Sequence, residues 1–286
     1  MTRWPHIPES LRLPTDLPRP ETDPRVTWLG WLNAGLFRVW HKAYRSDFTQ
    51  TSHAHHTASV DFNIAGAGAG AYLGRERESR AGGVEFYRPD GDHAFRCGSS
   101  GIRVLHVIFN DSLVTPHDAR RATAAFEPFD PDEGAAAGLA ARILREVSHP
   151  DPSPALVIES AAHELLGAMR RFPSIPAIGS KAVTAAVEIL RNSPTQALGL
   201  ADLAARVDLH PAHLARAFRQ AMGVSPGEYH RRVRIARAAK GLAIGDKPIA
   251  GLAGDLGFAD QAHLTRWFTR VAGISPASYR RAMRGR

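Results

Sequence analysis

The last third of the chain repeats one pattern of apolar and polar positions. Apolar residues recur at helical spacing over residues 200–207 and again over 214–222, with a polar break between the two runs and Gly223 after the second. The same order of run, break, run and glycine returns about fifty residues later and ends at Gly273. Two short amphipathic helices joined by a tight break are typical of a helix-turn-helix. The pattern predicts two such units, with a helical bundle that binds no ligand as the alternative.

The two units also agree residue by residue. The matched pairs are His213 with His263, Leu214 with Leu264, Arg216 with Arg266, Phe218 with Phe268, Gly223 with Gly273 and Tyr229 with Tyr279. Two copies are too few for a solenoid, so the repeat indicates a duplicated supersecondary unit. Asp260 is a good N-cap for the second helix of the second unit. His210 and Pro211 begin the corresponding helix of the first, where proline is well tolerated.

A further helix is predicted between the units. Ser225 is its expected cap, Pro226 occupies its first turn, and it continues to about Ala243. This helix would fix the separation of the two units. Its arginines are candidates for phosphate contacts or for a solvated surface: Arg231, Arg232, Arg234 and Arg237.

The first half of the chain follows a different pattern. Short apolar runs are separated by Gly, Asn and Asp clusters, which is typical of a small antiparallel barrel or jelly roll. The runs are Leu36–Trp40, Ser59–Ile64, Gly83–Tyr87 and Val104–Phe109. We expect the Ala/Gly stretch 65–71 to form a hairpin turn, with a flexible linker as the alternative. Residues 1–25 hold six prolines and are expected to form an extended arm.

Helical spacing returns over residues 133–147 and 154–171. These helices would either pair two subunits or pack on the barrel, and amphipathicity does not separate the two possibilities. The predicted fold class is therefore α+β, with a barrel and helices followed by an all-α domain. The expected ranges are an arm at 1–25, a sensor and dimerisation domain at 26–171, a linker at 172–179 and a helix-turn-helix domain at 180–286.

Charge distinguishes the two halves. Residues 181–286 hold 17 Lys and Arg against 7 Asp and Glu, whereas residues 1–180 hold 19 against 21, within a net charge of +8 for the chain. A polyanion is the expected partner of the basic half. The 286 residues contain one cysteine, Cys97, which excludes a disulfide framework. No signal segment or membrane span is recognisable, so we expect a cytoplasmic protein with no membrane partner.

The segment from Gly257 to Phe268, followed by Gly273-Ile274-Ser275-Pro276, closely resembles the second helix-turn-helix of the AraC/XylS family of transcription regulators. The resemblance runs from about residue 181 to the end of the chain. It implies that the second helix of each unit enters the major groove, in successive grooves of one duplex. The implied base-reading positions are Ala212, Ala215 and Arg216 in the first unit, and Gln261, Ala262, His263 and Arg266 in the second. Arg219 and Arg270 lie farther along the same helices and suit phosphate contacts.

Two fragments of the first half resemble the motifs of cupins. One is His53-Ala54-His55-His56 with Asp61, and the other runs from Gly83 to His93. His53, His55, Asp61 and His93 are the candidate metal ligands, because imidazole and carboxylate suit Zn, Fe, Mn or Ni. Barrels of the AraC family resemble cupins without generally keeping a metal. We therefore expect no cofactor and assign His53, His55, His56 and His93 to effector contact, with a purely structural role left open.

These observations predict a transcription regulator rather than an enzyme. Its expected partners are operator DNA, an unknown small effector, a second copy of the chain and RNA polymerase. A metal-dependent cupin enzyme or metal sensor joined to a DNA-binding domain is the alternative, and a non-specific DNA organiser is a third possibility. Trp40, Phe62 and Tyr87 are candidates for lining the effector pocket, although packing explains them equally well.

Overall fold

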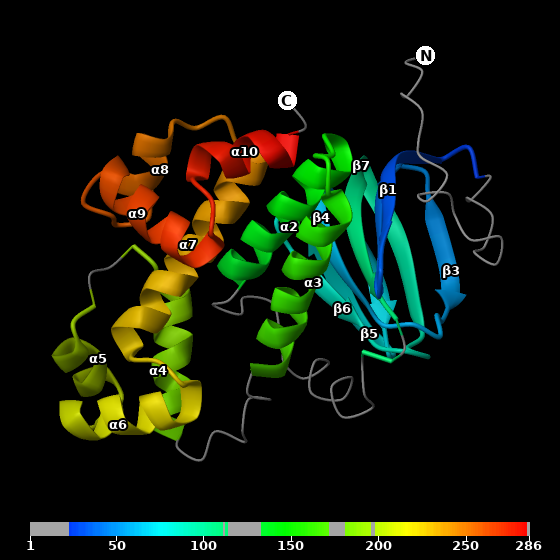
Figure 1. Ribbon diagram of the computed structural model, residues 1–286. Helices are drawn as coiled ribbons and strands as arrows, with labels where there is room; N and C mark the ends of the chain where they lie inside the picture. Colours follow the sequence, from blue (N-terminus) through cyan, green and yellow to red (C-terminus); the bar gives the residue numbers. More distant parts are fainter. Residues whose placement is uncertain (1–22, 111, 114–132, 172–180, 196–197, 285–286) are drawn as a thin grey trace.

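A computed structural model describes residues 23–110, 112–113, 133–171, 181–195 and 198–284. An antiparallel β-structure forms one side of the molecule, and helices cover its other side (Figure 1). The predicted arm and the linker at 172–179 lie outside the described residues, apart from the last three residues of the arm. No helix of the described part is long and apolar enough to cross a membrane.

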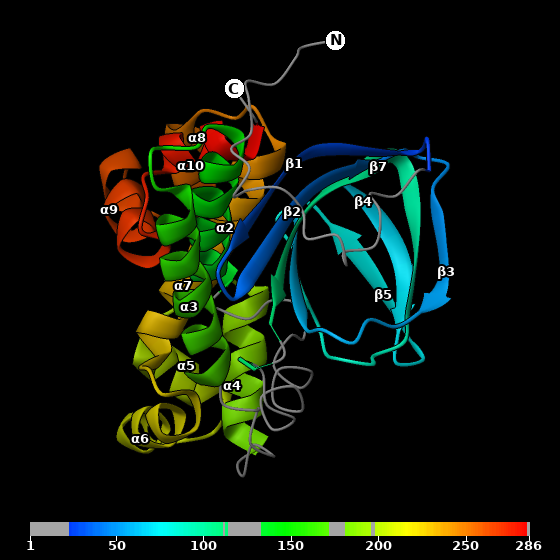
Figure 2. The ribbon, with the colours of Figure 1, turned by 45° about the vertical axis from the view of Figure 1, so that its right-hand side comes forward.

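Seven strands form the sheet within the described residues. They are β1 (Val26–Ala34), β2 (Phe37–Tyr44), β3 (Thr49–His53), β4 (Ser59–Tyr72), β5 (Arg75–Arg80), β6 (Val84–Tyr87) and β7 (His93–Phe109). The order is β1-β2-β7-β4-β5, with β3 beside β7 and β6 beside β4, and every pairing is antiparallel. Because β7 and β4 are long and pair with several partners, the sheet curls round on itself (Figure 2). The predicted α+β class with an antiparallel barrel is confirmed.

The sequence suggested a hairpin turn at the Ala/Gly stretch 65–71, and this prediction was wrong. The stretch lies within β4, and the turn comes later, at Leu73 and Gly74. Small residues are needed here because neighbouring atoms come very close. A Cβ on Gly68 would lie 2.4 Å from the ring of Phe95, and one on Gly70 would lie 2.1 Å from the carbonyl oxygen of Ala94. Register shifts near residues 63–68 also bend the strand so that it joins two parts of the barrel.

The two faces of the sheet differ in chemistry because side chains alternate along each strand. One face is apolar and buried, and its members include Phe37, Val39, Val60, Phe62, Phe86, Leu105 and Val107. The helices α2 (Glu133–Ser148) and α3 (Pro154–Arg171) pack against this face. The opposite face carries the polar and aromatic side chains that line the interior of the barrel.

The remaining helices match the predicted repeat. They are α4 (Lys181–Asn192), α5 (Leu200–Arg206), α6 (Pro211–Met222), α7 (Pro226–Ile244), α8 (Ile249–Asp255), α9 (Gln261–Ala272) and α10 (Pro276–Arg284). Asp260 caps α9 by accepting from the backbone N–H of His263 at 2.6 Å. Ser225 caps α7 by accepting from the backbone N–H of Glu228, and His210 caps α6 by accepting from that of Ala212, both at 3.3 Å. Gly223 and Gly273 adopt the left-handed conformation that ends α6 and α9.

The two helix-turn-helix units have different surroundings. The first unit, α5 and α6, shares a separate core with α4 and the start of α7. The second unit, α8 and α9, belongs to the core that also contains α2, α3 and the apolar face of the sheet. Gly138 of α2 touches the backbone of α9, since a Cβ there would lie 1.9 Å from the oxygen of Ala272. Arg103 of β7 also donates to the backbone oxygen of Met283 in α10.

Candidate DNA-reading surface and ligand cavity

Each candidate reading helix is held by the same aromatic pair. Phe218 of α6 packs edge-on against Tyr229 with ring centroids 5.5 Å apart, and Phe268 of α9 packs against Tyr279 at 5.4 Å. All four rings are fully buried. This geometry explains the repeated residues seen in the sequence: the buried face of each helix is fixed, and the opposite face is directed to solvent.

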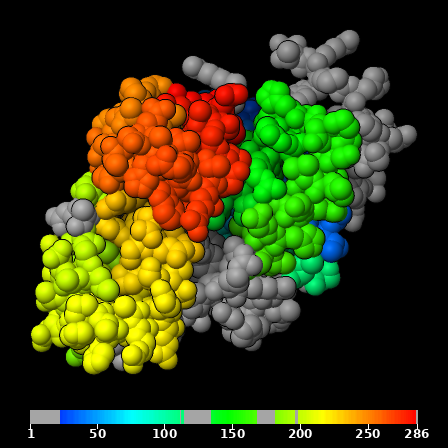
Figure 3. All heavy atoms as spheres, turned by 60° about the vertical axis from the view of Figure 1, so that its left-hand side comes forward, coloured from blue at the N-terminus to red at the C-terminus, as the bar shows by residue number. Residues whose placement is uncertain are grey.

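The predicted reading residues lie mainly on those solvent faces. Exposed members are Ala212, Arg216, Arg219, Gln261, Ala262, Arg266 and Arg270, and the half-buried members are Ala215 and His263. His263 is partly engaged within the protein, because its Nδ1 accepts from the backbone N–H of Ala259 and its ring lies 5.5 Å from that of Phe258. In Figure 3, α9 (orange) and the first unit (yellow) lie on one face of the molecule.

The arginines of α7 make contacts within the chain. Arg232 pairs with Glu228 at 2.8 Å, and Arg237 donates to the backbone oxygen of Arg191 at 2.5 Å. The guanidinium of Arg231 lies 4.6 Å from the centroid of Trp267. The Arg232 pair lies within α7, whereas the contacts of Arg237 and Arg231 link α7 to α4 and α9, a role that the sequence did not indicate.

Arg234 connects the two units directly. Its Nε donates to the oxygen of Pro194, beside the first unit, at 2.6 Å, and its Nη1 donates to the oxygen of Gly257, in the turn of the second unit, at 3.1 Å. Gly257 has a φ of +70°, and a Cβ there would lie 2.7 Å from the oxygen of Thr195. We call Arg234, Gly257 and residues 193–195 the junction. The junction joins the turn of the second unit to the segment between α4 and the first unit.

The barrel interior encloses a cavity of about 510 Å³. Inward-facing residues of β2, β4 and β7 supply most of its lining, together with the loop after β3. Trp40 and Tyr87 line it, as the sequence suggested. Phe62 points the other way, into the apolar core behind the sheet.

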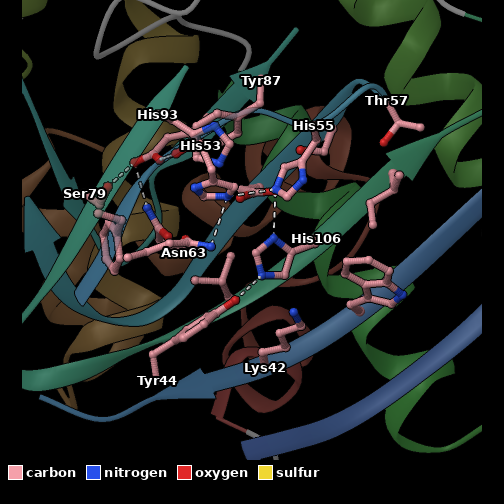
Figure 4. A pocket seen from close by; sticks show the side chains of 18 of the residues that line it. Lys42, Tyr44, His53, His55, Thr57, Asn63, Ser79, Tyr87, His93 and His106 are labelled. Carbon is pink, nitrogen blue, oxygen red and sulfur yellow. Dashed lines mark hydrogen bonds and ion pairs between the residues drawn. The ribbon is translucent and has the colours of Figure 1, made fainter. Parts of the chain in front are cut away.

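Three histidines meet at one side of the cavity (Figure 4). The ligand atoms of His53, His55 and His93 all lie within 4.8 Å of one another, and the Nε2 atoms of His53 and His55 are 3.2 Å apart. Direct pairing of His53 with His93 between β3 and β7 brings distant parts of the sequence together. The Nδ1 atoms of His53 and His93 each contact a backbone oxygen at 3.0 Å, those of Thr51 and Gly91. With Nδ1 donating to these oxygens, each Nε2 is left as an acceptor, and that of His53 also lies 3.1 Å from the side-chain nitrogen of Gln50.

The histidine cluster suits a transition-metal ion. Two nitrogen ligands at about 2.1 Å from a metal lie roughly 3.0–3.4 Å from each other, which includes the observed 3.2 Å. Desolvation, and next the imidazoles of His53 and His93, lower the pKa of His55 to about 4. Burial also lowers the pKa of His93. Lowered pKa values favour the neutral form of His55 and His93, and neutral imidazoles present lone pairs that can hold a metal or accept hydrogen bonds from a ligand.

The other two candidates lie apart from this cluster. Asp61 has an oxygen 3.0 Å from Nδ1 of His106, whose Nε2 is 3.2 Å from the hydroxyl of Tyr44. His56 is exposed at the rim and pairs with Asp90 at 2.9 Å. The sequence interpretation missed His106, although its place between Val104 and Ile108 on alternate positions of β7 was a usable signal.

The half-buried carboxylate of Glu85 organises another side of the cavity. Glu85 accepts from Asn63 at 3.1 Å, from Tyr87 at 2.7 Å and from Ser79. Burial and the nearby charge of Glu85 raise the pKa of Tyr87 well above its usual value. Tyr87 is therefore a neutral hydrogen-bond donor at physiological pH.

Residues 203–282 match a family model described as a helix-turn-helix domain. The chain carries an AraC-type helix-turn-helix domain. This AraC-type domain includes both reading helices, α6 and α9, and the helix between them. No curated protein matches the chain.

Solved structures resemble parts of the chain. The C-terminal domain of AraT, a response regulator from Geobacillus stearothermophilus, is 28% identical over 36% of this chain and 85% of its own, with a TM-score of 0.34. The DNA-binding domain of the global transcriptional factor AdpA, solved with a target DNA, is 28% identical over 37% of this chain and 95% of its own, with a TM-score of 0.35. An RmlC-like cupin from Shewanella frigidimarina is 19% identical over 29% of this chain and 78% of its own, with a TM-score of 0.26.

Proposed function

We propose that this protein is a sequence-specific transcription regulator controlled by a small molecule that binds in the barrel cavity. The observation that carries the proposal is the pair of reading helices in the AraC-type domain, α6 and α9, each anchored by a buried aromatic pair and each presenting exposed arginines. Two solvent-facing helices on one face of a basic domain suit neighbouring major grooves.

The side chains assign different tasks to different positions. Arg216 and Arg266 can each donate twice to guanine, Gln261 can pair with adenine, and the alanines contact thymine methyl groups or leave space. Arg219 and Arg270 are assigned to phosphate. The second unit offers more base-reading groups than the first, so we expect it to specify more of the site.

Selection from a pool of random duplexes, with the full chain in moderate salt, tests this function. We expect enrichment of a two-part motif whose halves lie about one helical turn apart. The better-defined half should belong to the second unit. A pool that shows no sequence preference would refute specific regulation and favour a non-specific DNA organiser.

The cavity supports effector control. Its volume of about 510 Å³ falls within the usual range for small-molecule sites. The apolar back of the barrel contacts the same helices that support the second unit, so a ligand can couple to DNA affinity through packed elements. A footprint on the upstream region of the gene, with and without candidate metabolites, measures that coupling. A footprint that no metabolite alters would count against it.

A second candidate function is metal sensing or metal-dependent catalysis, which the convergence of His53, His55 and His93 favours. Elemental analysis of the purified protein tests it, with His56→Ala as the matched control because His56 lies at the rim. Stoichiometric metal that is lost in His53→Ala, His55→Ala and His93→Ala but kept in His56→Ala would support this candidate. Absence of metal in protein incubated with Zn²⁺ or Fe²⁺ would reject it.

Self-association and contact with RNA polymerase complete the proposal. Most of α2 is buried against the sheet and the second unit. Of these two helices, α3 therefore offers the exposed surface for dimer formation, and Leu156 on that surface is 67% exposed. Light scattering of the full chain and of Leu156→Glu would measure the effect. The proposed domain ranges remain 1–25, 26–171, 172–179 and 180–286.

A further inference from the structure

We propose that one wall of the barrel cavity, formed by Trp28, Arg38, Trp40 and Lys42, binds the carboxylate of a small organic acid with a planar, apolar body. This inference rests on the proposed role of the cavity as the effector site, and it names the chemical class of the effector. We call these four residues the basic wall.

The basic wall follows from strand geometry. Arg38, Trp40 and Lys42 occupy alternate positions of β2 and all line the cavity, and Trp28 pairs with Lys42 from the adjacent strand β1. The ammonium of Lys42 lies 4.4 Å from the ring centroid of Trp28 and 4.8 Å from that of Trp40. The residue is only 7% exposed, so its charge is held in place beside two indoles. Figure 4 shows Lys42 directed into the cavity beneath His106.

The basic wall presents donors and no side-chain acceptor. Guanidinium, ammonium and indole groups all donate only. The indole N–H groups of Trp28 and Trp40 are buried, and neither has a hydrogen-bond partner among the described residues. Arg38 likewise makes no hydrogen bond or ion pair within the described part of the chain. The guanidinium of Arg38, on the same strand as the ammonium of Lys42, makes this wall complementary to an oxyanion.

The acidic groups of the cavity already have other partners. Asp61 lies against His106, and Glu85 accepts three hydrogen bonds from neighbouring side chains. They also make the cavity unfavourable for a ligand that carries two negative charges, because like charges repel across a site of low dielectric constant. A carboxylate, with a single charge and two acceptor oxygens, is therefore favoured over a phosphate monoester.

The rest of the cavity suits an apolar, planar ligand body. Tyr44, Tyr87 and Phe95 line it together with the two indoles of the basic wall. Aromatic side chains on several strands leave room for a flat group between them, within the volume of about 510 Å³.

The test measures binding of a matched panel to the full chain. The probes are benzoate, phenylacetate, 2-naphthoate and indole-3-acetate, the primary amide of each acid, and phenyl phosphate. Calorimetry gives the affinities, and quenching of tryptophan emission reports occupancy beside Trp28 and Trp40. We expect at least one acid to bind about tenfold or more tightly than its amide and than phenyl phosphate, since charge-assisted bonds are the stronger ones. Lys42→Met and Arg38→Gln should each weaken that acid about tenfold or more.

Controls separate the subsite from general damage. Arg45→Gln removes a cation that does not line the cavity and should leave acid binding unchanged. If Lys42→Met fails to fold, Arg38→Gln provides the same comparison without removing the stacked ammonium. The subsite is overturned if no acid in the panel binds at millimolar concentration, if amides or phenyl phosphate bind as well as the acids, or if Arg38→Gln has no effect.

The same preparations enter the duplex selection, so the two proposals fail separately. Sequence preference without acid binding overturns the subsite and leaves the regulator intact. Acid binding that depends on Arg38 and Lys42, in a protein with no sequence preference, supports the subsite and overturns the proposed regulatory function.

Discussion

The two helix-turn-helix units are nearly equal in themselves and differ in what surrounds them. Both place a buried phenylalanine against a buried tyrosine, and both end their second helix at a left-handed glycine. Among the described residues, the first unit shares its core with α4 and α7, whereas the second shares a continuous core with α2, α3 and the barrel. Duplication therefore explains the shape of each unit, and the asymmetric surroundings place the second unit in the core that it shares with the barrel.

The contacts of the second unit are close. Backbone meets backbone where Gly138 lies against Ala272, and Gly134 of the same helix lies beside Ile235 of α7. On the barrel side, Arg103 reaches the end of α10. The first unit is connected to these elements through α7 and the junction at Arg234.

Breaking α7 should have the largest effect, because this helix joins the two units. Ala236 is buried in the middle of α7, where proline removes a hydrogen bond and clashes with the preceding turn at a cost of about 3 kcal/mol or more. We expect Ala236→Pro to abolish specific binding to the selected duplex. Circular dichroism and duplex binding are measured together. A folded variant with normal affinity would show that the spacing of the units is not set by α7.

Filling the contact between α2 and α9 should separate the second unit from the barrel. A Cβ at Gly138 meets backbone that cannot rotate away, so Gly138→Val should lower the free energy of unfolding by about 3 kcal/mol. Gly254→Ala is the matched control, since a Cβ there meets nothing within 4 Å, and it should stabilise α8 by about 0.5–1 kcal/mol. Urea titrations give both values. Equal stability of the two variants would contradict the close contact.

Lowering the pH should reduce the free energy of unfolding, through a histidine on the side of the barrel near the second unit. His41 is buried, and desolvation together with Arg103 lowers its pKa to about 4. The unfolded chain therefore binds a proton that the folded chain rejects between pH 6.5 and about 4. This contribution to stability, up to about 3 kcal/mol, is complete above pH 6.5 and is lost as the pH falls through that window. Urea titrations from pH 7 to 4 should show a shallower loss in His41→Gln than in the parent.

Replacing the equivalent arginines, Arg266 and Arg216, compares the base specificity expected of the two units. Arg266→Ala should weaken binding to the selected duplex by about 1–3 kcal/mol and relax preference at one base pair. Arg216→Ala changes the corresponding position of the first unit, where the neighbouring alanines offer fewer polar contacts. Repeating the selection with each variant identifies the affected base pair. Unchanged preference in Arg266→Ala would remove this residue from the reading set.

Sequence patterns predicted the helices well because helical caps and periodicity are local. Caps and stops such as Ser225, Asp260, Gly223 and Gly273 act on backbone groups that are near them in the sequence. The Ala/Gly stretch of β4 was misinterpreted because its glycines make room for Phe95 and Ala94, which lie on another strand. Local composition alone resembled a turn.

The cavity was predicted only in part for a similar reason. His53 and His55 are neighbours in sequence, but their meeting with His93 depends on strand register. Asp61 was grouped with them through the resemblance to a cupin motif, whereas the fold places it beside His106. The packing of α2 on α9 was also missed. The Gly-and-Ala-rich start of α2, residues 134–138, was the available sign of a close helix contact.

Because the first unit has a small core of its own, we expect it to open before the second unit does. A cluster that shares no buried side chains with the barrel opens at a lower free energy than one continuous with it. Amide hydrogens of α5 and α6 should thus exchange with solvent sooner than those of α8 and α9. On a bound duplex, release would begin at the end held by the first unit, while the second still keeps the protein in register.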